Sequence, residues 1–185
     1  MVGLGNPGER YRRTRHNAGF MALDVLAARA RAAGRLEEDV WVAEATLAGA
    51  PALLVKPLAF MNASGGPVAR LLAERSGSPS DLVVLVDDVA LDLGILRVRE
   101  RGSHGGHNGL RSLVETLGTE EFARVRIGVR RGELPPELAE YVLADFHPDE
   151  ALIVQEAVGL AADAALCLLA EGAAAAMNRF NGPRL

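Results

Sequence analysis

The run Leu82-Val83-Val84-Leu85-Val86 is followed directly by Asp87-Asp88. A short, continuous apolar run is typical of a strand that is buried on both faces, as in the centre of a parallel sheet. Loops at the carboxyl ends of such strands are where α/β proteins bind ligands. This stretch therefore predicts an α/β fold with polar side chains gathered along one edge of its sheet.

The segments on either side alternate between helix and strand patterns. Apolar residues at helical spacing predict a helix over residues 18–33, which Gly34 would end. Val40–Leu47 and Ala52–Lys56 flank the turn-forming segment Ala48-Gly49-Ala50-Pro51 and predict a β-hairpin. Further predictions are strands over residues 1–4, 95–99 and 124–129, helices over 64–75, 108–117 and 149–175, and a loop over 130–136.

A hairpin pairs antiparallel strands, so the predicted sheet must be mixed. We predict a single domain over residues 1–185, with an α/β fold in which a mixed β-sheet is sandwiched by α-helices. The length of 185 residues and the apolar content of 49% suit one layered core. The first predicted strand is short, and we expect it to begin before Met1.

Composition favours a cytoplasmic protein without a membrane span. Cys167 is the only cysteine, which excludes an internal disulfide and fits a reducing compartment. Glycine and proline appear by residue 8, so the N-terminus does not have the pattern of a signal peptide. Polar and acidic residues interrupt the apolar run 151–176, which predicts a soluble amphipathic helix.

The arginines predict a phosphate-binding face despite the net charge of −4, which argues mildly against an RNA partner. Arg97, Arg99 and Arg101 alternate along one predicted strand and therefore point to one side of it. Arg124 and Arg126 repeat that spacing on another strand. The plainer alternative is a solvated surface in a chain that uses arginine in place of lysine.

Five short polar segments lie beside glycines or at the end of a predicted strand. They are Gly3-Leu4-Gly5-Asn6-Pro7-Gly8, Arg15-His16-Asn17-Ala18-Gly19, Phe60-Met61-Asn62-Ala63-Ser64-Gly65, Val86-Asp87-Asp88 and Gly105-Gly106-His107-Asn108-Gly109. A neutral imidazole such as His16 can take a proton from water near pH 7, and a carboxylate such as Asp87 can fix its tautomer. The amides of Asn62 and Asn108 can hold a carbonyl, an oxyanion or a water. Together these groups predict a hydrolytic site.

In their order and spacing the five segments resemble the bacterial peptidyl-tRNA hydrolase family, whose pattern reads G-L-G-N-P-G, T-R-H-N-A-G, F-M-N-x-S-G, D-D and G-G-H-N-G-L. The likeness covers almost the whole chain, down to Met177-Asn178-Arg179-Phe180-Asn181. It implies a monomer that hydrolyses the ester between an N-blocked aminoacyl or peptidyl group and tRNA, with no cofactor and no metal.

The resemblance also implies a role for each candidate residue. His16 is the general base, with Asp87 and Asn6 as the other catalytic residues; Tyr11, Phe60, Asn62 and Asn108 bind the substrate; Arg99 and Arg126 clamp the tRNA 5′-phosphate. The chain departs from the family where D-D-L-D-L-P-x-G is usual, because residues 87–94 read D-D-V-A-L-D-L-G. Counting back from Gly94 selects Asp87 as the partner of His16, whereas a shifted loop selects Asp88.

Each candidate also has a purely structural alternative. His16 could cap a helix or fill the core, and Asp87 could simply end a strand. Asn62 and Asn108 each precede a predicted helix, where asparagine is a good N-cap. Asn6 precedes Pro7 and could be a plain turn residue.

Other functions are weaker interpretations of the same sequence. Gly3-x-Gly5-x-x-Gly8 is a formal dinucleotide motif for a nicotinamide-dependent enzyme, but the acid expected after a second strand is missing. His104-x-x-His107 could bind a metal, yet no third ligand accompanies it. No serine lies in a G-x-S-x-G elbow. A non-catalytic RNA-binding module on the same scaffold is the remaining alternative.

Overall fold

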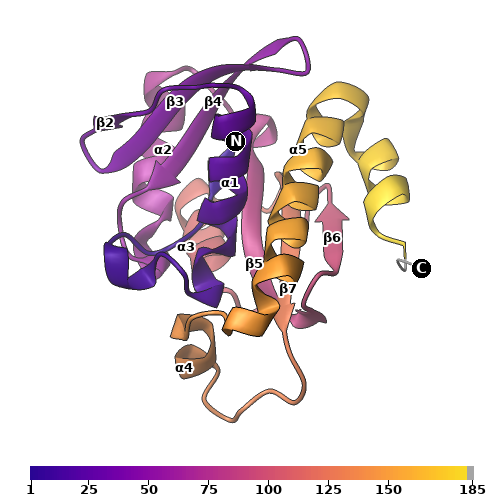
Figure 1. Cartoon of the computed structure of the whole chain (residues 1–185). Helices are drawn as coiled ribbons and strands as arrows, with labels where there is room; N and C mark the ends of the chain where they lie inside the picture. The colour runs from indigo at the N-terminus through magenta and orange to yellow at the C-terminus, as the bar shows by residue number, and fades with distance from the viewer. Residues whose placement is uncertain (183–185) are drawn as a thin grey trace.

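The computed structural model describes residues 1–182, and a seven-stranded mixed sheet forms its middle layer (Figure 1). The strands are β1 (Val2–Gly3), β2 (Arg35–Glu37), β3 (Val40–Leu47), β4 (Ala50–Pro57), β5 (Val83–Asp92), β6 (Leu96–Arg99) and β7 (Ala123–Arg130). Their order is β2-β3-β4-β1-β5-β7-β6. The four central strands are parallel, and antiparallel strands extend the sheet on both sides.

Helices cover both faces, as the sequence predicts. The helices are α1 (Ala18–Arg29), α2 (Gly65–Glu74), α3 (Asn108–Leu117), α4 (Leu138–Leu143) and α5 (Ala151–Phe180), and short 3-10 turns include η1 (Glu9–Tyr11), η2 (Arg15–Asn17), η3 (Met61–Ala63), η4 (Pro79–Asp81) and η5 (Pro148–Glu150). In Figure 1, α1 and α5 lie in front of the sheet and α2 and α3 lie behind it. Leu85 packs into the core on the α1 and α5 side, whereas Val84 and Val86 pack into the core on the α2 and α3 side.

The α/β sandwich and the β3–β4 hairpin are confirmed, but several boundaries differ from the prediction. Helix α1 ends at Arg29 rather than near Gly34, because Arg31 adopts a left-handed conformation with φ 51°. The chain then enters β2, which the sequence analysis missed together with α4. Strand β5 runs on to Asp92, so Asp87 and Asp88 lie within the strand and not after it.

Helix α5 also runs further than predicted, to Phe180, with a break at Gly172 where φ is 85°. The segment Pro148–Phe180 is long and apolar enough to cross a membrane by length and composition. In this fold it lies against the sheet, and its buried side chains, Ala161 and Leu168 among them, belong to the main core. Helix α5 is therefore a core helix of an α/β protein.

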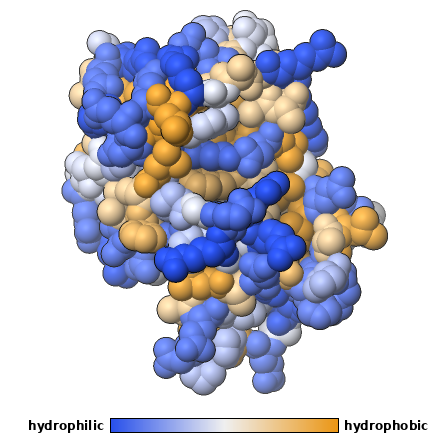
Figure 2. Space-filling model, turned by 60° about the vertical axis from the view of Figure 1, so that its left-hand side comes forward, coloured by the Kyte–Doolittle hydropathy of each residue, from blue (hydrophilic) through white to orange (hydrophobic). Residues whose placement is uncertain are grey.

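Beyond the break, the end of α5 turns back towards the sheet edge. The side chain of Asn181 accepts a hydrogen bond from the backbone N–H of Val98 (2.6 Å) and donates one to the Val98 carbonyl (3.0 Å). These are the bonds that a further strand would make to β6, so Asn181 covers part of an otherwise open edge. The face turned forward in Figure 2 is mainly hydrophilic, with hydrophobic side chains in separate patches.

Candidate active site

The predicted site residues gather at the carboxyl ends of β1 and β4 and on the outer half of β5. Asn6 follows β1, Asn62 lies on η3 after β4, and Asp87 lies in β5. Two further segments reach this edge: η2 brings His16, and the start of α3 brings Asn108. The parallel arrangement of β4, β1 and β5 is what brings their following segments together.

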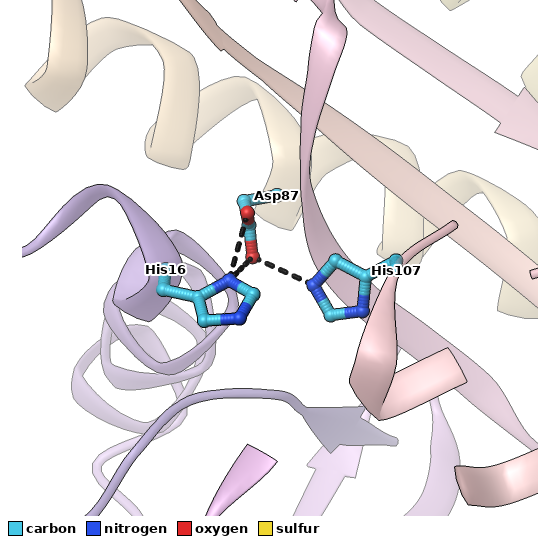
Figure 3. Close-up of side chains that lie close together, drawn as sticks. All are labelled: His16, Asp87 and His107. Atoms are coloured by element: carbon cyan, nitrogen blue, oxygen red, sulfur yellow. Dashed lines mark hydrogen bonds and ion pairs between the residues drawn. The ribbon is translucent and has the colours of Figure 1, made fainter. Parts of the chain in front are cut away.

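Asp87 lies between two imidazoles (Figure 3). Its carboxylate oxygens are 2.9 and 3.0 Å from Nδ1 of His16, and Oδ1 is 2.9 Å from Nε2 of His107. The centroids of the two rings are 4.9 Å apart. Asp87 is 2% exposed and His16 is 7% exposed, so these contacts are largely shielded from water.

The hydrogen bonds of His107 determine where its proton lies. Nδ1 of His107 accepts from the backbone N–H groups of Gly109 (3.1 Å) and Leu110 (3.2 Å), so His107 is the N-cap of α3. A neutral ring that accepts at Nδ1 carries its proton on Nε2, and here Nε2–H donates to Asp87. The carboxylate can only accept, so Nδ1 of His16 also carries a proton. Nε2 of His16 is thereby left with a free lone pair, as a general base requires.

The carboxylate of Asp87 is ionised over the whole physiological pH range. Burial by itself would raise its pKa, but the electrostatic attraction of His107 and His16 and the hydrogen bonds from their ring N–H groups outweigh burial and hold the pKa of Asp87 well below its ordinary value. Asp87 can therefore stabilise an imidazolium on His16 without accepting its proton.

Asn6 is tied down by three hydrogen bonds. Its backbone N–H donates to Oδ1 of Asn17 (2.8 Å), and Nδ2 of Asn17 donates to its carbonyl (3.0 Å). Oδ1 of Asn6 accepts from the N–H of Met61 (2.8 Å), which links the β1 and β4 loops. Because the oxygen is engaged in this way, the amide nitrogen of Asn6 is the part of its side chain that is left to donate to a ligand.

Asn62 and Asn108 are both exposed, and the turns that carry them pack closely. A Cβ atom at Gly109 would lie 2.5 Å from the sulfur of Met61, so a larger residue there would force the Met61 side chain to move. The N-cap alternative is wrong for Asn108, because His107 caps α3, and for Asn62, which lies inside η3.

The two predicted aromatic residues lie together beside this site. The rings of Tyr11 and Phe60 meet edge to face, with centroids 6.5 Å apart and planes at 89°. Phe60 is 56% exposed, so its side chain is accessible to a ligand.

The arginines of β6 and β7 share one face of the sheet. Arg97 pairs in register with Arg126, and Arg99 pairs with Arg124. Arg99 is exposed and Arg126 is partly exposed, so both can meet a ligand. Arg124 cannot, because it is 1% exposed.

The guanidinium of Arg124 is bound instead to backbone carbonyls of the loop that leads to His107 and of the segment just before β7. Its partners are the carbonyls of Gly102, Ser103, Glu120 and Phe122. Burial lowers the pKa of Arg124 to about 10. The repeated arginine spacing on β7 therefore contributes one surface arginine and one buried anchor, rather than two arginines to a phosphate-binding face.

His16, Asp87 and His107 also form a group whose ligand atoms lie within 4.8 Å of one another. A metal bound to Nε2 of His107 would require the proton on Nδ1, where two backbone N–H groups already donate. The donor set therefore fits a hydrogen-bond network better than a metal ion. The predicted partner His104 is not in this group, and its Nδ1 accepts from the N–H of Gly106 instead.

His107 is the residue that sequence reasoning missed, since it was weighed only as half of a metal-binding pair. A usable signal was present: it stands directly before a predicted helix and next to Asn108, inside one of the five polar segments. A histidine that caps a helix through Nδ1 has its Nε2–H group free to donate to a nearby acceptor, such as a carboxylate.

The glycines of the dinucleotide motif serve close packing. A Cβ atom at Gly5 would lie 2.6 Å from the ring of Phe20, and one at Gly3 would lie 2.5 Å from the carbonyl oxygen of Gly19. Strand β1 leads into the 3-10 turn η1 rather than directly into a helix, so no helix N-terminus faces the turn as phosphate binding would need.

Residues 1–185 match the family model described as Peptidyl-tRNA hydrolase. The chain is 46% identical to a peptidyl-tRNA hydrolase of Symbiobacterium thermophilum, over 98% of this chain and 97% of the relative. It is 44% identical to one of Brevibacillus brevis, over 98% and 96%. The crystal structure of peptidyl-tRNA hydrolase from Acinetobacter baumannii is similar with a TM-score of 0.91 and 30% identity, covering 99% of this chain and 94% of that one.

Proposed function

This chain belongs to the peptidyl-tRNA hydrolase family, and from that premise we propose that His16 is the general base of its reaction. The chain hydrolyses the ester between tRNA and a peptidyl or N-blocked aminoacyl group and so releases tRNA. The observation that carries the proposed role is the hydrogen bond between Nδ1 of His16 and Asp87, which leaves Nε2 of His16 as the ring nitrogen that can accept a proton. Because the chain belongs to a family of hydrolases, the alternative of a non-catalytic RNA-binding module is not favoured.

In the proposed reaction, a water bound to Nε2 of His16 gives up its proton as its oxygen attacks the ester carbonyl. The new C–O bond converts the carbonyl into an oxyanion, and the imidazolium of His16 is stabilised by the carboxylate of Asp87. When the tetrahedral intermediate collapses, the bond to the ribose 3′-oxygen breaks and His16 returns the proton to that oxygen. The peptide acid and the free tRNA then leave.

We assign the three asparagines and the two aromatic residues to substrate positioning. The Nδ2 group of Asn6 would donate to the first peptide carbonyl, which a free aminoacyl group does not offer. Asn62 and Asn108 would hold the ester carbonyl or the attacking water, and Tyr11 and Phe60 would line the groove. The test is to compare N-acetyl-aminoacyl-tRNA with unblocked aminoacyl-tRNA: rapid cleavage of both would contradict the role of Asn6.

We also propose that the enzyme works without a metal, as a cytoplasmic monomer. Treatment with a chelator followed by desalting is expected to leave turnover of N-acetyl-aminoacyl-tRNA unchanged, because the cap of α3 keeps the proton of His107 on the nitrogen that a metal would need. Loss of activity that returns with added zinc would contradict this. Elution during size-exclusion chromatography at the mass of one chain would support the monomer.

Arg99 and Arg126 form the proposed clamp for the tRNA 5′-phosphate, since both are surface arginines on one sheet face. Replacing either with alanine is expected to weaken tRNA binding for all sequences. The slope of log binding constant against log salt should fall by about one phosphate contact for each arginine removed. Arg29→Ala is a matched control, because Arg29 pairs with Asp163 on α5 on the other face. An unchanged slope in Arg126→Ala would remove this residue from the clamp.

A further inference from the structure

The two adjacent aspartates of β5 face opposite sides of the sheet. Side chains alternate along a strand, so Asp87 lies on the face of Leu85 and Asp88 lies on the face of Val86. Leu85 packs under α1 and α5, whereas Val86 packs under α2 and α3. Asp87 therefore meets His16 from η2, and Asp88 is directed to the face that carries Arg126.

Asp88 forms a close ion pair with Arg126, in which Nε of Arg126 makes no hydrogen bond of good geometry. It is 6% exposed, and its Oδ2 lies 3.0 Å from Nε of Arg126. Its other oxygen accepts from the backbone N–H of Ala90 (2.9 Å), which fixes the direction of the carboxylate. The contact is to Nε, the guanidinium nitrogen nearest the backbone, so the two terminal nitrogens remain as the pair that can grip a phosphate.

The glycine-rich loop that contains Gly105 also limits the space around the guanidinium of Arg126. Gly105 has φ +57°, and a Cβ atom there would lie 2.8 Å from Nη2 of Arg126. Arg97 lies directly opposite Arg126 in the β6–β7 register, and a like charge at that position would push the guanidinium away. The buried carboxylate of Asp88 counters this repulsion and limits the rotamers of the Arg126 side chain.

We propose that Asp88 is a positioning residue for phosphate recognition: it orients the Arg126 guanidinium towards the tRNA 5′-phosphate, while Asp87 serves the ester chemistry. This rests on the proposed clamp. A buried ion pair adds little net stability compared with well-packed apolar residues, so a role in orientation accounts better for two charges placed here. Asp88 would thus orient Arg126 for phosphate binding, as Asp87 orients His16 for ester hydrolysis.

The test compares two forms of one substrate, N-acetyl-aminoacyl-tRNA with its 5′-phosphate and the same tRNA after phosphatase treatment. Wild type is expected to have the lower KM for the phosphorylated form. In Asp88→Asn the ratio of the two KM values should shrink by about tenfold. This is the size expected when the charged hydrogen bond from Arg126 to the phosphate is weakened. The loss should appear in KM for the phosphorylated tRNA alone. Asp92→Asn is the control, because Asp92 lies on the same strand but is exposed and pairs with Arg130.

The outcomes separate this inference from the proposed clamp. If Arg126→Ala leaves the phosphate preference intact, the clamp is wrong and the role of Asp88 falls with it. If Arg126→Ala removes the preference and Asp88→Asn keeps it, the clamp stands and the role of Asp88 is overturned. A loss of kcat on both substrates in Asp88→Asn would also overturn it. Should Asp88→Asn not fold, Asp88→Glu, which keeps the charge but moves the oxygens, should show the same selective rise in KM.

Discussion

Replacement of His16 with alanine is expected to reduce kcat for N-acetyl-aminoacyl-tRNA by about 10²- to 10⁴-fold, the usual contribution of a general base. Nε2 of His16 is the basic nitrogen that the Asp87–His107 network leaves free, so its removal takes away the acceptor for the proton of water. Single-turnover kinetics with excess enzyme measures the chemical step directly. Binding of tRNA should persist, because Arg99 and Arg126 are unchanged.

The matched control is His147→Ala. The side chain of His147 is 67% exposed and pairs with Asp149 next to α5, so its loss should leave kcat near the wild-type value. Thermal unfolding of both variants shows whether the fold is kept. A His16→Ala enzyme that folds and retains full turnover would show that another group activates the water.

Much of the fold could be predicted because its main elements carry strong local patterns. The continuous apolar run predicts the core of β5, and the predicted bounds of α3 agree with the structure. Strand β2 was missed because it is three residues long and mostly exposed, so it has no apolar face to detect. Helix α4 has six residues, too few for a helical period to show.

The site was predictable as a set of residues but not as a set of contacts. Local sequence identifies His16 and a pair of aspartates, whereas the choice between Asp87 and Asp88 depends on how far β5 continues. That length is set by pairing with β7, where Asp87 and Asp88 lie opposite Ile127 and Gly128. The pairing of Asp87 with His107 joins residues 20 apart in the chain, and it follows from the cap of α3 rather than from a residue pattern.

Conversion of Asp87 to asparagine is expected to lower kcat by roughly 10⁴-fold while keeping the volume of the side chain, as loss of the tautomer-fixing carboxylate does in a related arrangement. An amide has one oxygen and one NH₂ group. The cap of α3 keeps His107 as a donor through Nε2, so His107 takes the amide oxygen. The NH₂ group then faces Nδ1 of His16, which must accept, and the proton of His16 moves to Nε2, where the base is needed.

This mechanism can be followed by ¹⁵N NMR of the histidine rings, which distinguishes a protonated Nδ1 from a protonated Nε2. The proton of His16 should be on Nδ1 in wild type and on Nε2 in Asp87→Asn, with the ring of His107 unchanged in both. His107→Asn is a useful comparison variant, because it removes the Nε2–H donor of His107 to Asp87 without changing the carboxylate. If Asp87→Asn retained the wild-type tautomer and lost activity, the role of Asp87 would be to stabilise the imidazolium and not to fix the neutral ring.

The stability of the same variant tests the depressed pKa of Asp87. The folded pKa lies below the unfolded value of about 3.9, so the contribution of the carboxylate is complete above that pH and is lost as pH falls towards the folded pKa. The difference in free energy of unfolding between wild type and Asp87→Asn should therefore shrink as pH falls below about 4. A difference that grew on acidification would mean that burial, rather than the two imidazoles, dominates at this carboxylate.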